Sequence, residues 1–113
     1  MNTLKFYPKE RKVFLDGNEV KPEASQKLIN HSPDGFAWGY GGSGPSQLSL
    51  AILLHFLNPE NAMDKYQDFK WAIISMIPNT DEVVELEIDI PKYLEKGKGA
   101  IGILKPKMLG KDQ

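Results

Sequence analysis

The chain of 113 residues contains no cysteine. This absence excludes disulfide bonds, thiol catalysis and zinc sites built on thiolate ligands. Histidine is also scarce, with His31 and His55 far apart and no carboxylate cluster of ligand spacing near either. Zinc and calcium sites need several such ligands close together. We therefore expect no metal and no cofactor.

Long apolar runs are missing as well. The longest, residues 48–57, is interrupted by Ser49 and His55 and is shorter than the roughly 20 residues that cross a bilayer. The N-terminal residues lack the apolar segment of a signal peptide. The net charge of −1 disfavours a surface that grips nucleic acid broadly. We expect a soluble, cytoplasmic protein with neither membrane nor nucleic acid as a partner.

The apolar pattern predicts an α+β fold. Alternating apolar pairs predict strands near 4–7 and 11–15, joined to a return near Val20 by a turn at Asp16-Gly17. The clearest strand is 84–90, where Glu85, Glu87 and Asp89 alternate with apolar residues and form a solvated acidic face. Residues 98–113 are either an edge strand or a mobile extension. We place one domain at residues 1–97.

Two main helices are expected. The first spans 45–57, with Gly44 as N-cap and Pro45 as first residue. Gln47 at the third helical position half-resembles a capping box, with its side chain reaching back to the cap backbone. It is apolar on nearly all faces, which is typical of a buried helix and would make His55 a core histidine. The second spans 60–77, capped by Asn58 and with Lys70 on its polar face. A small, mostly antiparallel sheet would pack on the first helix, with the second flanking it, and a short helical turn would run from 91 to 96.

Glycine is concentrated in residues 31–45, which we consider the functional segment. Phe36, Trp38 and Tyr40 alternate there, which predicts a short strand with Phe36 inside and the other two rings at the surface. A glycine-rich loop that leads into a helix N-terminus can bind phosphates or carboxylates through unpaired N–H groups. The candidate ligand-binding residues are Trp38, Tyr40, Gly41, Gly42, Ser43, Gly44, Ser46, Gln47, His31 and Asp34.

The same segment has other interpretations. It lacks the lysine of a Walker A loop and the surrounding βαβ unit of a dinucleotide-binding fold. The glycines could form only a tight corner without a ligand. Residues 32–35 predict a turn to which His31 or Asp34 would hydrogen-bond. A nucleophile–base pair of His31 with Ser43 or Ser46 would instead indicate a hydrolase.

The run NHSPDGFAWGYGGSGPSQL at residues 30–48 resembles an uncharacterised family of small proteins, catalogued as domain of unknown function 6166. The resemblance extends from about residue 11 to about residue 94 and leaves out the tail. It implies a cytoplasmic protein of phage, plasmid or prokaryotic origin, with no established activity and no catalytic residues to transfer.

Three function hypotheses follow. The first is non-catalytic binding of a phosphate-bearing small molecule, such as a nucleotide signal in phage counter-defence, at residues 38–47. The second is a protein-interaction module, such as an inhibitor of a host defence protein, that uses exposed aromatic residues beside that loop. The third, which the residues favour least, is a hydrolase. The oligomeric state stays open.

Overall fold

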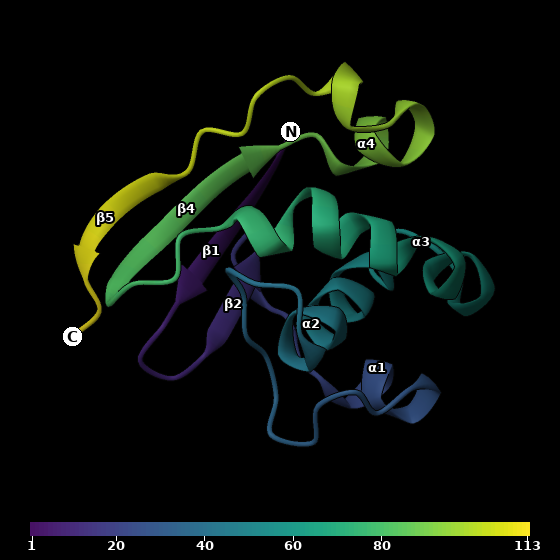
Figure 1. Ribbon diagram of the computed structural model, residues 1–113, viewed down its shortest axis with the longest axis horizontal. Coiled ribbons are helices and arrows are strands. Elements are labelled where there is room, and N and C mark those ends of the chain that lie inside the picture. Colours follow the sequence, from purple (N-terminus) through teal and green to yellow (C-terminus); the bar gives the residue numbers. More distant parts are fainter. The chain divides into compact units, whose positions relative to one another are not determined.

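The computed structural model describes residues 1–113, which divide into two compact units. The first unit comprises Met1–Glu19 and Pro78–Gln113 and contains a five-stranded antiparallel sheet in the order β3-β2-β1-β4-β5 (Figure 1). The second unit, Val20–Ile77, is helical. The fold is therefore α+β with an antiparallel sheet, as predicted. The packing of the sheet on a helix stays a prediction.

The N-terminal strands follow the predicted pattern. They are β1 (Asn2–Tyr7), β2 (Lys12–Leu15) and β3 (Asn18–Glu19). The turn between the last two uses left-handed φ angles at Asp16 (50°) and Gly17 (86°). The Asp16 carboxylate accepts hydrogen bonds from the Asn2 side chain and the Thr3 N–H, both at 2.8 Å. These two bonds lower the pKa of the Asp16 carboxyl.

Strand β4 (Glu82–Ile88) confirms the predicted alternation, with Leu86 and Ile88 buried and Glu87 exposed. It ends two residues earlier than we expected. Asp89 accepts a hydrogen bond from the Lys92 N–H at 3.1 Å and caps the next helix, α4 (Ile90–Lys96). An N-capping carboxylate stabilises a helix start, so Ile90 is buried as a helical residue.

The C-terminal residues form the edge of the sheet. Helix α4 ends at Gly97, whose φ is 87°, and a 3-10 turn, η2 (Lys98–Ala100), follows. The chain then leaves β4 and returns as β5 (Lys107–Lys111), antiparallel to β4 (Figure 1). The left-handed Gly110, with a φ of 97°, lies where the register shifts, as at a β-bulge. Of the two alternatives for this tail, the structure has the edge strand.

The helical unit contains α1 (Glu23–Leu28), α2 (Ser43–Leu53), α3 (Pro59–Ala72) and the 3-10 turn η1 (Ile74–Met76). Helix α2 is buried from Gly44 through Leu53 and packs against α3, which confirms the buried helix and its flanking neighbour. Asn58 caps α3 by accepting the Asn61 N–H at 2.8 Å, as predicted. None of these helices is long and apolar enough to cross a membrane.

The end of α2 differs from the prediction. After Leu53 the chain tightens into turns, in which the N–H of His55 donates to the Ile52 carbonyl and that of Phe56 to the Leu53 carbonyl, both at 3.0 Å. Bonds between residues three apart wind the chain more tightly than an α-helix. His55 is consequently exposed, and its prediction as a core histidine is wrong.

Candidate functional site

Residues 36–40 do not form the predicted strand. Gly35 and Gly39 adopt left-handed φ angles of 107° and 88°, which an extended strand does not accommodate. The Gly39 N–H donates to the Ile74 carbonyl at 3.1 Å, so the segment is held against η1. Phe36 is buried as expected, whereas Trp38, predicted at the surface, is only 3% exposed.

Helix α2 begins two residues earlier than predicted. Its N-cap is Gly42, and the Ser46 N–H and hydroxyl both reach the Gly42 carbonyl at 3.1 Å. Pro45 still lies in the first turn, where its missing N–H has no consequence. Ser43 is exposed at the helix start, whereas Gly44 and Ser46 are buried. The predicted capping box is absent because Gln47 has other partners.

Gln47 is the centre of a buried polar network. Its side-chain oxygen accepts the Ser32 N–H at 3.0 Å, and its amide nitrogen donates to the Ser25 hydroxyl at 2.8 Å and the Ile29 carbonyl at 3.1 Å. Ser25 donates in turn to the Pro22 carbonyl at 2.7 Å. Gln47 has no exposed surface. Its hydrogen bonds therefore link residues 22–32 to α2.

His31 also has an internal partner. Its Nε2 lies 2.7 Å from the Tyr66 hydroxyl of α3, and the two ring centroids are 5.6 Å apart. The predicted turn is present, because the Gly35 N–H donates to the Ser32 carbonyl at 3.3 Å. The imidazole makes no hydrogen bond to that turn or to a serine hydroxyl, so the pair of His31 with Ser43 or Ser46 is not formed. Asp34 is exposed at the turn.

The chain's own side chains pack tightly against three glycines of the loop. A Cβ added at Gly41 would lie 2.0 Å from the Trp71 ring, and one at Gly42 would lie 2.3 Å from the Tyr40 ring. A Cβ at Gly44 would lie 2.7 Å from that of Ala37 and 3.0 Å from its backbone nitrogen. A Cβ at Gly41 or Gly42 would force an exposed ring to move, whereas a Cβ at Gly44 would press on Ala37 itself. Packing alone therefore accounts for glycine at position 44.

We expect Gly44→Ala to destabilise the fold by about 1–3 kcal/mol, because neither Ala37 atom belongs to a flexible side chain that could move away. Gly99→Ala is the matched control, since a Cβ there meets nothing within 4 Å. Denaturant unfolding of both variants measures the difference in free energy. Equal stabilities would contradict the packing explanation for Gly44.

What remains accessible around the loop is largely apolar. Tyr40 is 50% exposed, Trp71 59% and Met76 61%. The contact of Trp71 with Gly41 places Trp71 beside the loop that carries Tyr40. The bond from Gly39 to Ile74 brings η1, which ends at Met76, to the same loop. We call this the Tyr40–Trp71 surface and define it by Tyr40, Gly41, Ser43, Trp71 and Met76, with the buried Lys70 in contact with the Trp71 ring.

Lys70 was predicted on the polar face of its helix, but only 6% of it is exposed. Its ammonium lies 4.5 Å from the centroid of the Trp71 ring and 3.5 Å from the Gly41 carbonyl oxygen. A cation at this distance from an indole ring is attracted by the ring's quadrupole. The signal that could have found Lys70 is its spacing, because it follows the buried Tyr66 by four residues.

The structure thus separates the predicted site residues. Tyr40, Gly41, Gly42 and Ser43 stay accessible to differing degrees beside Lys70 and Trp71, which sequence analysis missed, while Trp38, Gly44, Ser46 and Gln47 are buried. The chain holds no group of three or more acidic or histidine side chains arranged to hold a metal ion.

No curated protein and no solved structure matches the chain. One family model, described as a family of unknown function (DUF6166), matches residues 8–96. The match includes the whole glycine-rich segment, α2 and α3, and it ends before the residues that form β5. The chain therefore belongs to the DUF6166 family.

Proposed function

We propose that the chain is a protein-interaction module that binds its partner through the Tyr40–Trp71 surface. The observation that supports this most is the exposure of half or more of Tyr40, Trp71 and Met76 around one loop. Clustered exposed apolar side chains mark interaction sites more often than isolated ones do. Tyrosine, tryptophan and methionine are also the residue types enriched where proteins associate.

Trp71 has the features of an interface anchor. Lys70 and Gly41 both contact its ring, so less side-chain freedom is lost when a partner covers it. Preorganised aromatic side chains contribute much of the energy at many interfaces. In α3, the exposed Asp68 and Asp64 precede Trp71 by about one and two helical turns. Their carboxylates favour a partner that presents a basic side chain next to an apolar one.

We expect Trp71→Ala and Tyr40→Ala each to weaken partner binding by at least about tenfold, since truncation of an anchoring aromatic commonly removes more than about 1.4 kcal/mol. Leu109→Ala, at an exposed apolar residue of β5, is the matched control. A partner captured by the wild-type protein would be purified and titrated calorimetrically against all four chains. Unchanged affinity for both aromatic variants would contradict the proposal.

The second candidate function is binding of a phosphate-bearing small molecule, such as a nucleotide. The Lys70 ammonium beside the loop and the start of α2 at Ser43 favour it, because a cation and a helix N-terminus both attract anions. Tyr40 and Trp71 would supply faces for stacking. Its test is thermal shift against mono-, di- and cyclic nucleotides, with Ser43→Ala as the variant. Trp38→Ala is unsuitable because it removes a buried ring.

The two functions give different outcomes. A nucleotide that raises the melting temperature of the wild type, and raises that of Ser43→Ala by a smaller amount, would support the small-molecule function. A partner protein lost on Trp71→Ala, with no nucleotide effect, would support the interaction module. The phage or prokaryotic source that the family resemblance implies makes a host defence protein the first partner to test.

A further inference from the structure

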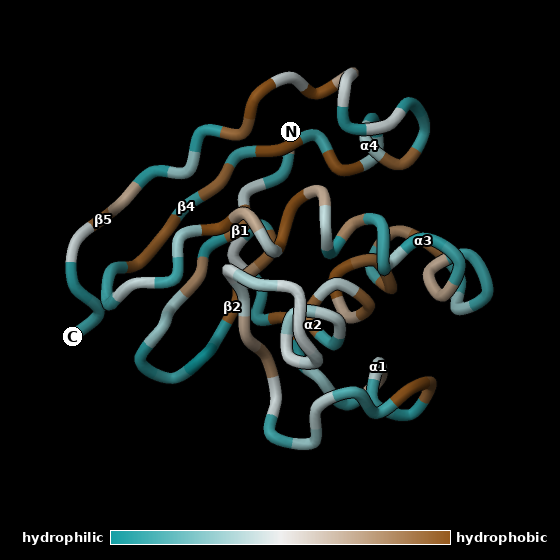
Figure 2. Tube along the Cα trace, viewed as in Figure 1, coloured by the Kyte–Doolittle hydropathy of each residue, from teal (hydrophilic) through white to brown (hydrophobic).

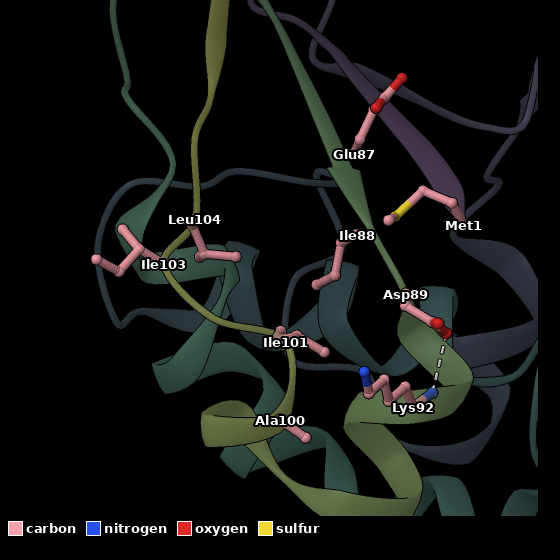
Figure 3. A pocket seen from close by; sticks show the side chains of 9 residues that line it. All are labelled: Met1, Glu87, Ile88, Asp89, Lys92, Ala100, Ile101, Ile103 and Leu104. Carbon is pink, nitrogen blue, oxygen red and sulfur yellow. Dashed lines mark hydrogen bonds between the residues drawn. The ribbon is translucent and has the colours of Figure 1, made fainter.

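A cavity of about 140 Å³ lies at the edge of β4, in the sheet unit (Figure 3). Three consecutive residues, Glu87, Ile88 and Asp89, line it. Met1, which precedes β1 on the other side of β4, lines the cavity as well (Figure 3), so the cavity extends over the end of β4 as well as along its free edge. Ile101 and Leu104, from the segment between α4 and β5, extend toward it from the other side (Figure 3).

The backbone of Glu87 faces this cavity. The Thr3 N–H donates to the Asp16 side chain, and the Thr3 carbonyl accepts the Asp16 N–H, so the Thr3 backbone points toward β2. Backbone groups alternate in direction along a strand. The backbone N–H and carbonyl of Asn2 therefore point toward β4, where Ile88 is its partner, and those of Ile88 point back toward β1. Glu87, adjacent to Ile88, points its N–H and carbonyl to the opposite edge.

No strand residue pairs with Glu87 at that edge. Strand β5 pairs with β4 only as far as Glu85, which lies opposite Lys107. Beyond that point the returning segment, which carries hydrophobic stretches (Figure 2), separates from β4 (Figure 1). An unpaired strand edge is a template for a further strand. We call the unpaired stretch of the β4 edge the gap. It extends from Lys107 to the start of α4 and is about 10 Å long, the length of three residues of an extended chain.

A second cavity of about 240 Å³ shares Met1, Glu87 and Ile103 with the first, and its charged lining includes Glu85, Lys105 and Lys107. None of these charges is paired, because the ion pairs of the chain are Lys12 with Glu10 and Lys111 with Asp81. Lys92 extends its side chain toward Ile101 at the other end of the gap (Figure 3). Unpaired charges of both signs thus line a short gap.

We propose that this gap, the β4 edge site, binds a short extended peptide of two or three residues with free termini. The peptide backbone pairs with the N–H and carbonyl of Glu87, as in other strand-addition complexes. Its ammonium group is attracted by the glutamates and its carboxylate by the lysines. An aliphatic side chain enters the space beside Ile88, Ile101 and Leu104. This site shares no residue with the Tyr40–Trp71 surface.

The test is a titration of the full chain with the tripeptide Ala-Leu-Ala, followed by amide chemical shifts in NMR spectra. We expect saturable shifts at the amides of Glu87 and Asp89. A tripeptide N-methylated at the leucine and alanine amides should bind about tenfold more weakly, because it keeps the side chains but loses the strand hydrogen bonds. Acetylation or amidation of the termini should each weaken binding several-fold.

A protein variant completes the test. Glu87→Gln, which keeps the backbone and shape, should weaken the tripeptide several-fold, whereas Glu60→Gln, at an exposed residue of α3, should leave affinity unchanged. Three results would overturn the proposal: no saturable shift at millimolar peptide, shifts confined to residues outside the β4 edge site, or equal affinity for the N-methylated peptide.

Discussion

Leu50→Ala is expected to lower the free energy of unfolding by about 2–5 kcal/mol. Leu50 lies in the middle of α2 and has no exposed surface, and its neighbours in the helix are buried as well. Removing its side-chain atoms loses the free energy of their burial and leaves a cavity. Because the helix is buried on all faces, the surrounding side chains cannot readily move in to fill that cavity. Leu53→Ala, also fully buried, should behave alike.

Two comparisons make this expectation specific. Met76→Ala removes a larger side chain, but one that is 61% exposed, so its stability should change by less than about 1 kcal/mol. Truncation after Gly97 removes β5, whose residues are mostly exposed, and should cost less than either leucine substitution. Urea unfolding of the four variants at one pH measures the order. A truncation as damaging as Leu50→Ala would show that β5 is integral to the fold.

Gln47→Leu is expected to destabilise the protein by about 2–5 kcal/mol. The substitution keeps the volume roughly constant but leaves the Ser32 N–H and the Ile29 carbonyl without their buried partner. A buried polar group deprived of its hydrogen bond costs about 1–3 kcal/mol, and two such groups are affected. The hydroxyl of Ser25 also loses a donor to it.

Gln67→Leu on α3 is the control, because Gln67 is half-buried and outside this network. Thermal unfolding measures the effect, and hydrogen exchange at the Ser32 amide reports on the network itself. We expect faster exchange there in Gln47→Leu. Unchanged stability together with unchanged exchange would show that water replaces the glutamine without penalty, and Gln47 would again be a candidate ligand residue.

Much of the fold could be predicted because its signals are local. The alternation of apolar residues predicted β1, β2 and β4. The residue types Asp16-Gly17 predicted the turn, and Asn58 predicted the start of α3. Each depends on residues within one or two turns of one another. The apolar pattern around α2 likewise identified a buried helix without any tertiary information.

The site could be predicted only in part, because it depends on contacts between distant segments. Nothing near Gly41 in sequence indicates that Trp71 packs on it or that Lys70 reaches its carbonyl. The aromatic alternation at Phe36, Trp38 and Tyr40 predicted a strand, but two left-handed glycines override it. The spacing of Gln47 from a glycine cap is the same whether its side chain reaches back to the cap or joins a buried network, so the sequence does not distinguish the two roles.

The pairing of β1 with β4 affects the order in which the chain folds. Asn2 lies opposite Ile88, so the central pair of the sheet joins residues from nearly opposite ends of the sequence. The β1–β2 hairpin and the helices of Val20–Ile77 form through contacts between residues that are closer together in the sequence. During synthesis from the N-terminus they are available first, whereas β4 must close a long loop before its contacts form. Until β4 emerges from the ribosome, the nascent chain exposes an edge of β1 that a chaperone could protect.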